Sequence, residues 1–491
     1  MNQKKELIKN TIIISIGKFS TRVVSFILLP LYTALLSKSE YGSYDLLNTI
    51  SIFLIPIITL QLEEGMFRFL IDAKSDEEKS KIFTQTIVYI TISFIISSLL
   101  IILFSNLISY KYGYYLVGYL FGSIIFNITT AFARGESRWK LYSFLSFINS
   151  FINIVLNVLF IAVFKWGLVG LFLAYIISCV IIGIYGLFKL GAYKYLNRKY
   201  LDKKTMNSMV KYAFPLVPNN ISWHAISLSD RLIITNILNV SANGIYSVAN
   251  KFPTIINTCY GFFNVSWRES ASKMVLKEER DEFYNSVYIN LKHFLMTSSI
   301  LIVAFLPFVF NILINSNFNE AYAYIPLMIL STYYANMSNF SSGIFAAYKD
   351  NKVLVPTTIV AAILNLIIGF VFIKKIGLFA PILGTLVSYA VINIYRNYKL
   401  RKYLILAKDK FTILNYLVFI IVSICYYTKI IWFELLALVL ALGYFYFLNR
   451  GLLKTLFNRS ILKKFKKHVD IVVYRRYNNQ RCRKKKCNEY I

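Results

Sequence analysis

Long apolar runs separated by short polar connections cover most of this chain. A helix that crosses a bilayer needs about 20 apolar residues. Spans of that kind are predicted at residues 9–36, 43–71, 82–106, 113–133, 142–164, 167–189, 211–238, 244–268, 286–314, 321–346, 353–373, 377–396, 411–428 and 430–449. The runs are continuous instead of alternating, so they predict helices and not the strands of a membrane barrel. We therefore expect an all-α integral membrane protein with about fourteen transmembrane helices.

Lysine and arginine predict the topology, because they are concentrated in every second connection. Connections on the amino-terminal side of the membrane hold 43 of the 54 basic residues, and the opposite connections hold six. Cytoplasmic connections carry such an excess, so both termini are predicted to be cytoplasmic. The basic tail, residues 450–491, is expected to contact anionic membrane lipid. The roles of Cys482 and Cys487 in this tail stay open.

Composition supports lipid as the solvent and argues against a nucleic-acid partner. The chain is 57% hydrophobic and 16% charged, whereas soluble proteins have about 45–50% apolar and about 25% charged residues. The net charge of +31 sits in short blocks between apolar runs and does not cover a soluble face. The first apolar run is too long for a signal peptide and predicts a retained span.

An internal repeat relates the spans at a constant offset of 202 residues. Leu36, Ser39, Gly42, Tyr44 and Asn48 are each matched by an identical residue, at 238, 241, 244, 246 and 250. Transporters are often built from repeated halves. We expect a six-helix lobe in residues 1–205, a second in 206–405, two additional helices in 406–449 and the basic tail, with a central cleft between the lobes.

Two cations in the first span are the sharpest candidates for substrate binding. Lys18 and Arg22 are four residues apart, so they share one helical face, and both lie near the middle of the span. An ionisable group at that depth costs at least about 2.5–3.5 kcal/mol, so it tends to face a partner or a wet cavity. Either the pair forms a cationic patch for an anionic headgroup, or acids on neighbouring helices neutralise it.

Further charged residues within the spans are candidates for binding, gating or coupling. Arg231 and Lys251 are candidates for substrate binding, while Asp230 and the mid-span His224 are candidates for gating or coupling. Asp230 and Arg231 are adjacent and point about 100° apart, so one can face the cleft while the other braces a neighbouring helix. His224 is either a proton relay or a packed, hydrogen-bonded histidine.

A cluster near the cytoplasmic end of the second span has two interpretations. Glu64 and Arg68 have the spacing of a local ion pair, and Glu63 lies beside them; a cytoplasmic gate is the alternative. Asparagines also recur at helical spacing. They either line the cleft or join helices: Asn149, Asn153 and Asn157 in one row, Asn257 and Asn264 in another.

The sequence contains no enzyme constellation. It has no phosphate-binding glycine loop, no metal-ligand cluster and no nucleophile beside a base, and the outer connections are too short for a catalytic domain. We therefore expect no catalytic residue, metal or cofactor.

Several motifs resemble the polysaccharide flippase family of the multidrug/oligosaccharidyl-lipid/polysaccharide exporter superfamily. They are Asn10, LPLY at 29–32, LSKSEYGSY at 36–44, DRLII at 230–234 and GIYSVANK at 244–251, together with the spacing of the spans up to residue 449. The resemblance implies two six-helix lobes that open alternately to each side of a bacterial cytoplasmic membrane. It also implies an oligosaccharide linked through diphosphate to a polyprenol as the substrate, with glycosyltransferases and a polysaccharide polymerase as possible partners.

Two other functions are weighed against the flippase. A cation-coupled multidrug exporter of the same superfamily is expected to favour acids in its cleft, whereas the first span carries two bases and no acid near its centre. A membrane enzyme such as a glycan polymerase is expected to need a sizeable outer loop, which the sequence lacks.

Overall fold

The computed structural model describes residues 26–107, 111–348 and 350–457, and these residues form helices with no strand among them. The prediction of an all-α membrane protein is confirmed. Contacts divide the chain into two compact units. Unit 1 comprises the described residues up to Asp281 together with Leu306–Leu406, and unit 2 comprises Glu282–Phe305 and the described residues from Ala407 onward.

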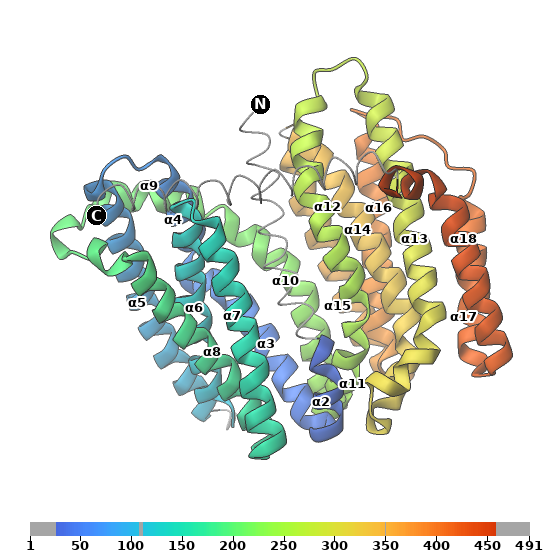
Figure 1. The fold of residues 1–491 in the computed structure, drawn as a ribbon, viewed down its shortest axis with the longest axis horizontal. Helices are drawn as coiled ribbons and strands as arrows, with labels where there is room; N and C mark the ends of the chain where they lie inside the picture. Colours follow the sequence, from blue (N-terminus) through green and yellow to red (C-terminus); the bar gives the residue numbers. More distant parts are fainter. Residues whose placement is uncertain (1–25, 108–110, 349, 458–491) are drawn as a thin grey trace, which may run out of the picture. The chain divides into compact units, whose positions relative to one another are not determined.

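The first half of unit 1 consists of eight α-helices with short connections (Figure 1). They are α2 (Leu29–Leu35), α3 (Lys38–Thr59), α4 (Leu62–Asp72), α5 (Asp76–Leu107), α6 (Gly113–Gly135), α7 (Trp139–Asn157), α8 (Gly167–Leu190) and α9 (Lys203–Ala213). A π-helix, η1 (Val158–Val163), extends α7, and the 3₁₀ turns η2 (Ala192–Tyr195) and η3 (Arg198–Tyr200) lead from α8 to α9.

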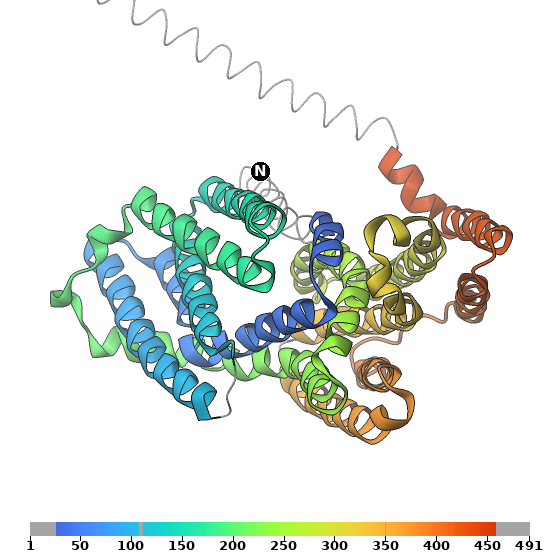
Figure 2. The same cartoon turned by 90° about the horizontal axis from the view of Figure 1, so that it is seen from below.

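The second half of the chain also consists of helices with short connections. Its elements are α10 (Leu216–Ile233), the π-helix η4 (Ile234–Leu238), α11 (Val240–Lys251), α12 (Pro253–Met274), α13 (Arg280–Leu313), η5 (Ser316–Tyr324), α14 (Ile325–Ala347), η6 (Asn351–Val353), α15 (Leu354–Ile376) and α16 (Phe379–Leu400). In unit 2, α17 (Thr412–Thr428) and α18 (Ile431–Phe457) pack against each other as a hairpin (Figure 2).

The surface of these helices requires lipid as its solvent. Nine helices among the described residues are long and apolar enough to cross a membrane. A long run of exposed apolar side chains lies on α5, where Leu99, Leu103 and Leu107 are 65%, 59% and 72% exposed. Apolar patches of this extent are rare on soluble monomers. Other helices, such as α10 and α14, are more polar because they carry buried hydroxyl, amide and charged side chains.

The second predicted span is broken where its backbone enters the left-handed region. Leu60 and Gln61 have φ values of 48° and 56° and separate α3 from α4. Positive φ is uncommon and strained for residues other than glycine, and such strain gathers at functional sites. The Gln61 side chain accepts a hydrogen bond from Asn220 Nδ2 at 3.0 Å, so the break joins α4 to α10.

The repeat seen in the sequence appears in the structure as two equivalent helix starts. Ser37 caps α3 and Asn239 caps α11, again 202 residues apart. Ser37 and Glu40 form a reciprocal capping box, and Asn239 Oδ1 accepts the Ala242 N–H at 2.8 Å. Both N-caps pair backbone N–H groups that have no partner within the first turn of the helix.

These two helix starts cross each other at glycines. A Cβ on Gly42 would lie 2.1 Å from the Val240 carbonyl oxygen, and a Cβ on Gly244 would lie 2.0 Å from the Lys38 carbonyl oxygen. The contacts are reciprocal, because Lys38 and Val240 are themselves 202 residues apart. Asn243 lies fully buried beside the crossing and donates from Nδ2 to the Gly42 oxygen at 2.8 Å. Only glycine permits so close a backbone approach.

In unit 2, a buried polar cluster holds the segment before α17 against α13. The Asp409 carboxylate lies 3.1 Å from Lys292 Nζ and 3.0 Å from His293 Nε2. Lys292 also donates to Thr412 Oγ1 at 2.5 Å. Burial alone raises the pKa of the Asp409 carboxyl, but hydrogen bonds from His293, the Phe411 N–H and Lys292 hold it below its usual value.

Candidate functional site

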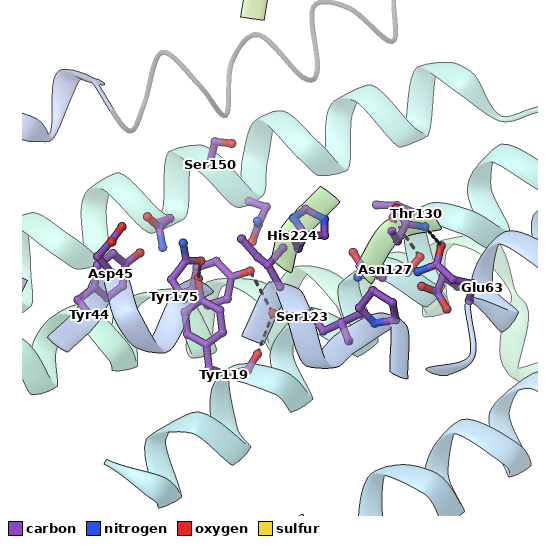
Figure 3. Close-up of a pocket in the computed structure, with 18 of the residues that line it drawn as sticks. Tyr44, Asp45, Glu63, Tyr119, Ser123, Asn127, Thr130, Ser150, Tyr175 and His224 are labelled. Carbon is purple, nitrogen blue, oxygen red and sulfur yellow. Dashed lines mark hydrogen bonds between the residues drawn. The ribbon is translucent and has the colours of Figure 1, made fainter. Parts of the chain in front are cut away.

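The main polar cavity of unit 1 has a volume of about 610 Å³ and is bounded by α2, α3, α4, α6, α7, α8, α10 and α11. Its lining residues are mostly polar or aromatic. They are Leu28, Tyr32, Tyr44, Asp45, Asn48, Ile52, Ile55, Pro56, Gln61, Glu63, Glu64, Tyr119, Ser123, Asn127, Thr130, Arg134, Asn149, Ser150, Asn153, Tyr175, Asn220, His224 and Lys251. Figure 3 shows the labelled side chains running from Tyr44 and Asp45 at one end to Thr130 and Glu63 at the other.

A stacked pair of tyrosines forms one wall of the cavity. The Tyr119 and Tyr175 rings are nearly parallel, with centroids 3.8 Å apart and an interplanar angle of 5°. The Tyr119 hydroxyl donates to Asn48 Oδ1 at 2.6 Å, and Ser123 Oγ lies 3.1 Å from the Tyr175 hydroxyl (Figure 3). These bonds fix the orientation of the rings and leave their polar edges in a hydrogen-bonded network.

The polar lining of α6 was missed in the sequence analysis, although its pattern is visible there. Tyr119, Ser123, Asn127, Thr130 and Arg134 recur at intervals of three or four residues, so they fall on one face of the helix. A polar stripe within an otherwise apolar span is the signal that predicts a cavity-facing side. The apolar composition of residues 113–133 concealed it.

The asparagines of α7 line the cavity and also join neighbouring helices, so both interpretations of that row hold in part. Asn149 and Asn153 face the cavity. Asn149 Nδ2 lies 3.8 Å from the Cys179 sulfur, and Asn153 Nδ2 donates to Ser178 Oγ at 3.3 Å. Asn157 is fully buried, and its Nδ2 bonds back to Asn153.

The predicted ion pair between Glu64 and Arg68 is wrong. Glu64 Oε1 instead accepts from Arg134 Nη2 of α6 at 2.7 Å, and Arg68 pairs with Asp72 at 2.6 Å. Arg68 is four residues from both acids, and it faces the exposed side of α4 where Asp72 lies. Arg68 does not line the cavity, whereas Glu64 and Arg134 do. Beside them Glu63 is buried, and its Oε2 has no hydrogen-bond partner among the described residues.

Asp230 and Arg231 are adjacent on α10 and have different partners. Arg231 Nε forms a buried ion pair with Asp45 Oδ2 at 2.7 Å and so links α10 to α3. Asp230 instead accepts three hydrogen bonds from neutral groups. The donors are Tyr246 at 2.7 Å, Asn365 at 2.9 Å and Thr385 at 2.9 Å. Neither Asp230 nor Arg231 lines the polar cavity, although Asp45 does.

Two of the remaining candidates line the polar cavity. Lys251 lies at the end of α11 and has its Nζ 5.9 Å from the centre of the Tyr41 ring. His224 of α10 projects toward the middle of the cavity (Figure 3). Lys18 and Arg22 lie outside the described residues, so their contribution to this site stays a prediction.

The charges of the described lining partly cancel. Asp45, Glu63 and Glu64 supply three carboxylates, and Arg134 and Lys251 supply two cations. Asp45 and Glu64 are ion-paired, the first with Arg231 and the second with Arg134. Within the described ranges, no group of three His, Cys, Asp or Glu residues is placed to hold a metal ion. The chemistry of the cavity is therefore dominated by amides, hydroxyls and aromatic rings.

Comparisons with known proteins agree with this picture. A family model described as a polysaccharide biosynthesis protein matches residues 7–268. The lipid II flippase MurJ in an inward closed conformation superposes with a TM-score of 0.70 and 16% identity, over 90% of this chain and 100% of that chain. An inward-facing multidrug resistance MATE transporter of the MOP superfamily gives 0.63 and 13%, over 78% and 95%.

The Vibrio cholerae MATE transporter VcmN superposes with a TM-score of 0.53 and 12% identity, over 81% of this chain and 97% of that chain. No curated protein matches the sequence. Identities this low show a shared fold alone, so these structures establish a multi-pass membrane transporter fold.

Proposed function

Because this chain belongs to the polysaccharide biosynthesis protein family, we propose that it moves a polyprenyl-diphosphate-linked oligosaccharide across a bacterial cytoplasmic membrane. Transport runs from the cytoplasmic to the outer leaflet by alternating access, with both termini in the cytoplasm. Cytoplasmic glycosyltransferases assemble such a substrate, and a polysaccharide polymerase consumes it on the other side, so both are candidate partners. The protein itself is not an enzyme in this proposal.

The observation that carries the proposal is a polar cavity inside a helical protein with an apolar exterior. Each unsatisfied polar group in hydrocarbon costs several kcal/mol, and an oligosaccharide carries many hydroxyl groups. Amides and phenols can donate to and accept from such hydroxyls, and the described lining offers five asparagines and four tyrosines. A flat ring such as Tyr175 also suits the apolar face of a sugar.

The diphosphate requires cations, and the proposal assigns them by position. Lys251 is the candidate within the cavity. Lys18 and Arg22 are expected to supply further positive charge from the first span. Arg231 is expected to supply positive charge once its ion pair with Asp45 opens. Glu64, Arg68, His224 and Asp230 keep the proposed roles in gating or coupling, with Arg68 the weakest of these because it is exposed and paired with Asp72. The polyprenol tail stays in lipid.

A cation-coupled multidrug exporter is the second candidate, and the three carboxylates of the lining favour it. Two of the three are already ion-paired, by Arg134 and Arg231, which leaves less negative charge for a cationic drug. A deletion strain that becomes broadly drug-sensitive while its surface polysaccharide stays normal supports the exporter over the flippase.

The decisive test measures translocation by the purified protein in liposomes. A short-chain polyprenyl-diphosphate oligosaccharide is supplied in one leaflet, and a membrane-impermeant glycosidase reports its arrival in the other. We expect Asn127→Leu, which removes a cavity amide, to slow translocation about tenfold, since one or two lost hydrogen bonds are worth about 1.4 kcal/mol. The matched control is Asn317→Leu, which removes an exposed amide outside the cavity.

In cells, replacing both Lys18 and Arg22 with Ala is expected to abolish surface polysaccharide at normal protein level. Unchanged export in that double variant removes the proposed role of these two cations. Transport of drugs without any movement of the oligosaccharide lipid refutes the flippase itself.

A further inference from the structure

A second, apolar groove lies on the side of unit 1 and has a volume of about 960 Å³. We call it the lateral groove. Its lining residues come from α3, α5 and α6 on one side and from α10, η4 and α11 on the other: Ser43, Leu46, Ile50, Leu54, Leu100, Ile101, Leu103, Phe104, Ser105, Leu107, Lys111, Tyr112, Leu116, Leu232, Thr235, Asn236 and Val240. The lateral groove shares no lining residue with the polar cavity.

The walls of the lateral groove are built for a hydrocarbon chain. Its α5 side presents Leu100, Leu103 and Phe104, which are 61%, 59% and 63% exposed. Along α3 the groove runs from Ser43 to Leu54. Eleven residues of helix span about 16 Å, which is about half of a 30 Å hydrocarbon core. The groove therefore has the length of one leaflet.

One end of the lateral groove is polar and positively charged. Of the described residues that line it, Lys111 alone carries a charge. Lys111 precedes the first residues of α6, and its Nζ lies 5.9 Å from the centre of the Tyr112 ring. Asn236 and Thr235 come from the π-helix η4, and the Thr235 hydroxyl oxygen is buried without a hydrogen-bond partner among the described residues. Such π-helical turns occur frequently at functional sites.

We propose that the lateral groove binds one anionic phospholipid. An acyl chain lies along α3 and α5, and the phosphate pairs with Lys111, while Asn236 and Thr235 can donate to headgroup or ester oxygens. The depth of one leaflet matches an acyl chain better than a polyprenol, which is several times longer. The proposal is independent of what the polar cavity transports.

The bound lipid would touch both walls of the groove, and this predicts a conformational effect. One wall belongs to α3 and α5 and the other to α10, η4 and α11. A ligand that contacts both walls binds this arrangement more tightly than an arrangement in which the walls are separated. The difference between these two affinities sets how far the ligand shifts the equilibrium toward this arrangement. Anionic phospholipid is thus expected to stabilise the arrangement described here.

The test uses purified full-length protein in neutral detergent, with phosphatidylglycerol or phosphatidylcholine of identical acyl chains added. Thermal unfolding and native mass spectrometry report binding. We expect phosphatidylglycerol to raise the Tm more than phosphatidylcholine does. Lys111→Gln should weaken phosphatidylglycerol binding about fivefold, the effect of one cation at a membrane surface. Leu103→Trp, which fills the groove from an exposed position, should abolish the shift for both lipids.

The matched control is Lys374→Gln, which removes an exposed lysine from the last turn of α15, away from the groove. It should bind phosphatidylglycerol as the unaltered protein does. Equal shifts for the two lipids, or equal losses in Lys111→Gln and Lys374→Gln, overturn the proposal. So does a result in which undecaprenyl phosphate occupies the groove and phosphatidylglycerol does not compete with it.

Discussion

Adding one methyl group at the crossing of α3 and α11 should open the contact between these helices. In Gly42→Ala the new Cβ would lie 2.1 Å from the Val240 oxygen and 2.8 Å from the Gly244 nitrogen. Real contacts between such atoms lie near 3.3–3.6 Å, so the helices must separate by about 1 Å. Overpacking of this kind typically costs about 1–3 kcal/mol. The closed crossing should become about 5–150-fold less populated relative to an open one.

Cross-linking at the same end of the helices measures this population. Lys38 Nζ of α3 and Glu320 Oε1 of η5 are 2.6 Å apart, and η5 packs against α11. The pair Lys38→Cys and Glu320→Cys, in a background without native cysteines, therefore reports whether α3 lies close to α11 and η5. A short bifunctional maleimide should link these positions efficiently in the parent and poorly after Gly42→Ala. Gly261→Ala is the matched control, because nothing lies within 4 Å of the Cβ it adds.

The reciprocal contacts of Gly42 and Gly244 predict a similar effect for a substitution at Gly244. Gly244→Ala meets the Lys38 oxygen at 2.0 Å, so it should lower the cross-linking yield as much as Gly42→Ala does. One separation of the helices relieves both clashes, and the double variant should therefore be clearly less affected than the sum of the two. Cross-linking in Gly42→Ala that equals that of Gly261→Ala would refute this account of the crossing.

Two further predictions concern buried charge. Asp45→Asn leaves Arg231 without its carboxylate partner and should destabilise the protein by about 3–5 kcal/mol in thermal unfolding. The control Asp72→Asn removes an exposed ion pair and should change stability by less than about 0.5 kcal/mol. Equal losses of stability in the two variants contradict the prediction that the buried pair matters more. Asp409→Asn should lower the Tm by weakening the contacts to Lys292. Because the pKa of Asp409 is lowered in the folded protein, its contribution to stability is fully present above pH ~4 and is lost as the pH falls through the lowered folded pKa. A Tm difference between parent and variant that does not shrink as the pH is lowered below ~4 contradicts this.

The class of fold was predictable because the length and apolar composition of the spans identify them as transmembrane helices. A continuous run of apolar residues on α5 or α8 has no stable place in water, so length and composition decide its environment. The break at Leu60 and Gln61 was not predictable, since neither residue is a glycine or proline and the strain depends on tertiary contacts. For that reason the single span predicted over 43–71 consists of two helices, α3 and α4, in the structure.

The site was predictable where a charge interrupts an apolar run and hard to predict elsewhere. Lys251 and His224 stand out in their spans and line the cavity. The predicted Glu64–Arg68 pair is wrong because helical spacing allows Arg68 to pair with either Glu64 or Asp72. In the structure Arg68 pairs with Asp72, and Glu64 pairs with Arg134 of α6. That choice depends on which helices are neighbours, and sequence spacing within one helix carries no information about it.

The two helix starts that correspond at an offset of 202 residues differ in side-chain chemistry, which argues for different tasks. Tyr44 and its repeat partner Tyr246 occupy equivalent places on α3 and α11. Tyr44 lines the polar cavity, whereas Tyr246 donates its hydroxyl to the buried Asp230. The cavity therefore belongs mainly to the first half, and the second half holds a carboxylate surrounded by neutral donors. The Asp45–Arg231 ion pair joins α3 of the cavity wall to α10, the helix that carries Asp230, and so connects these two environments.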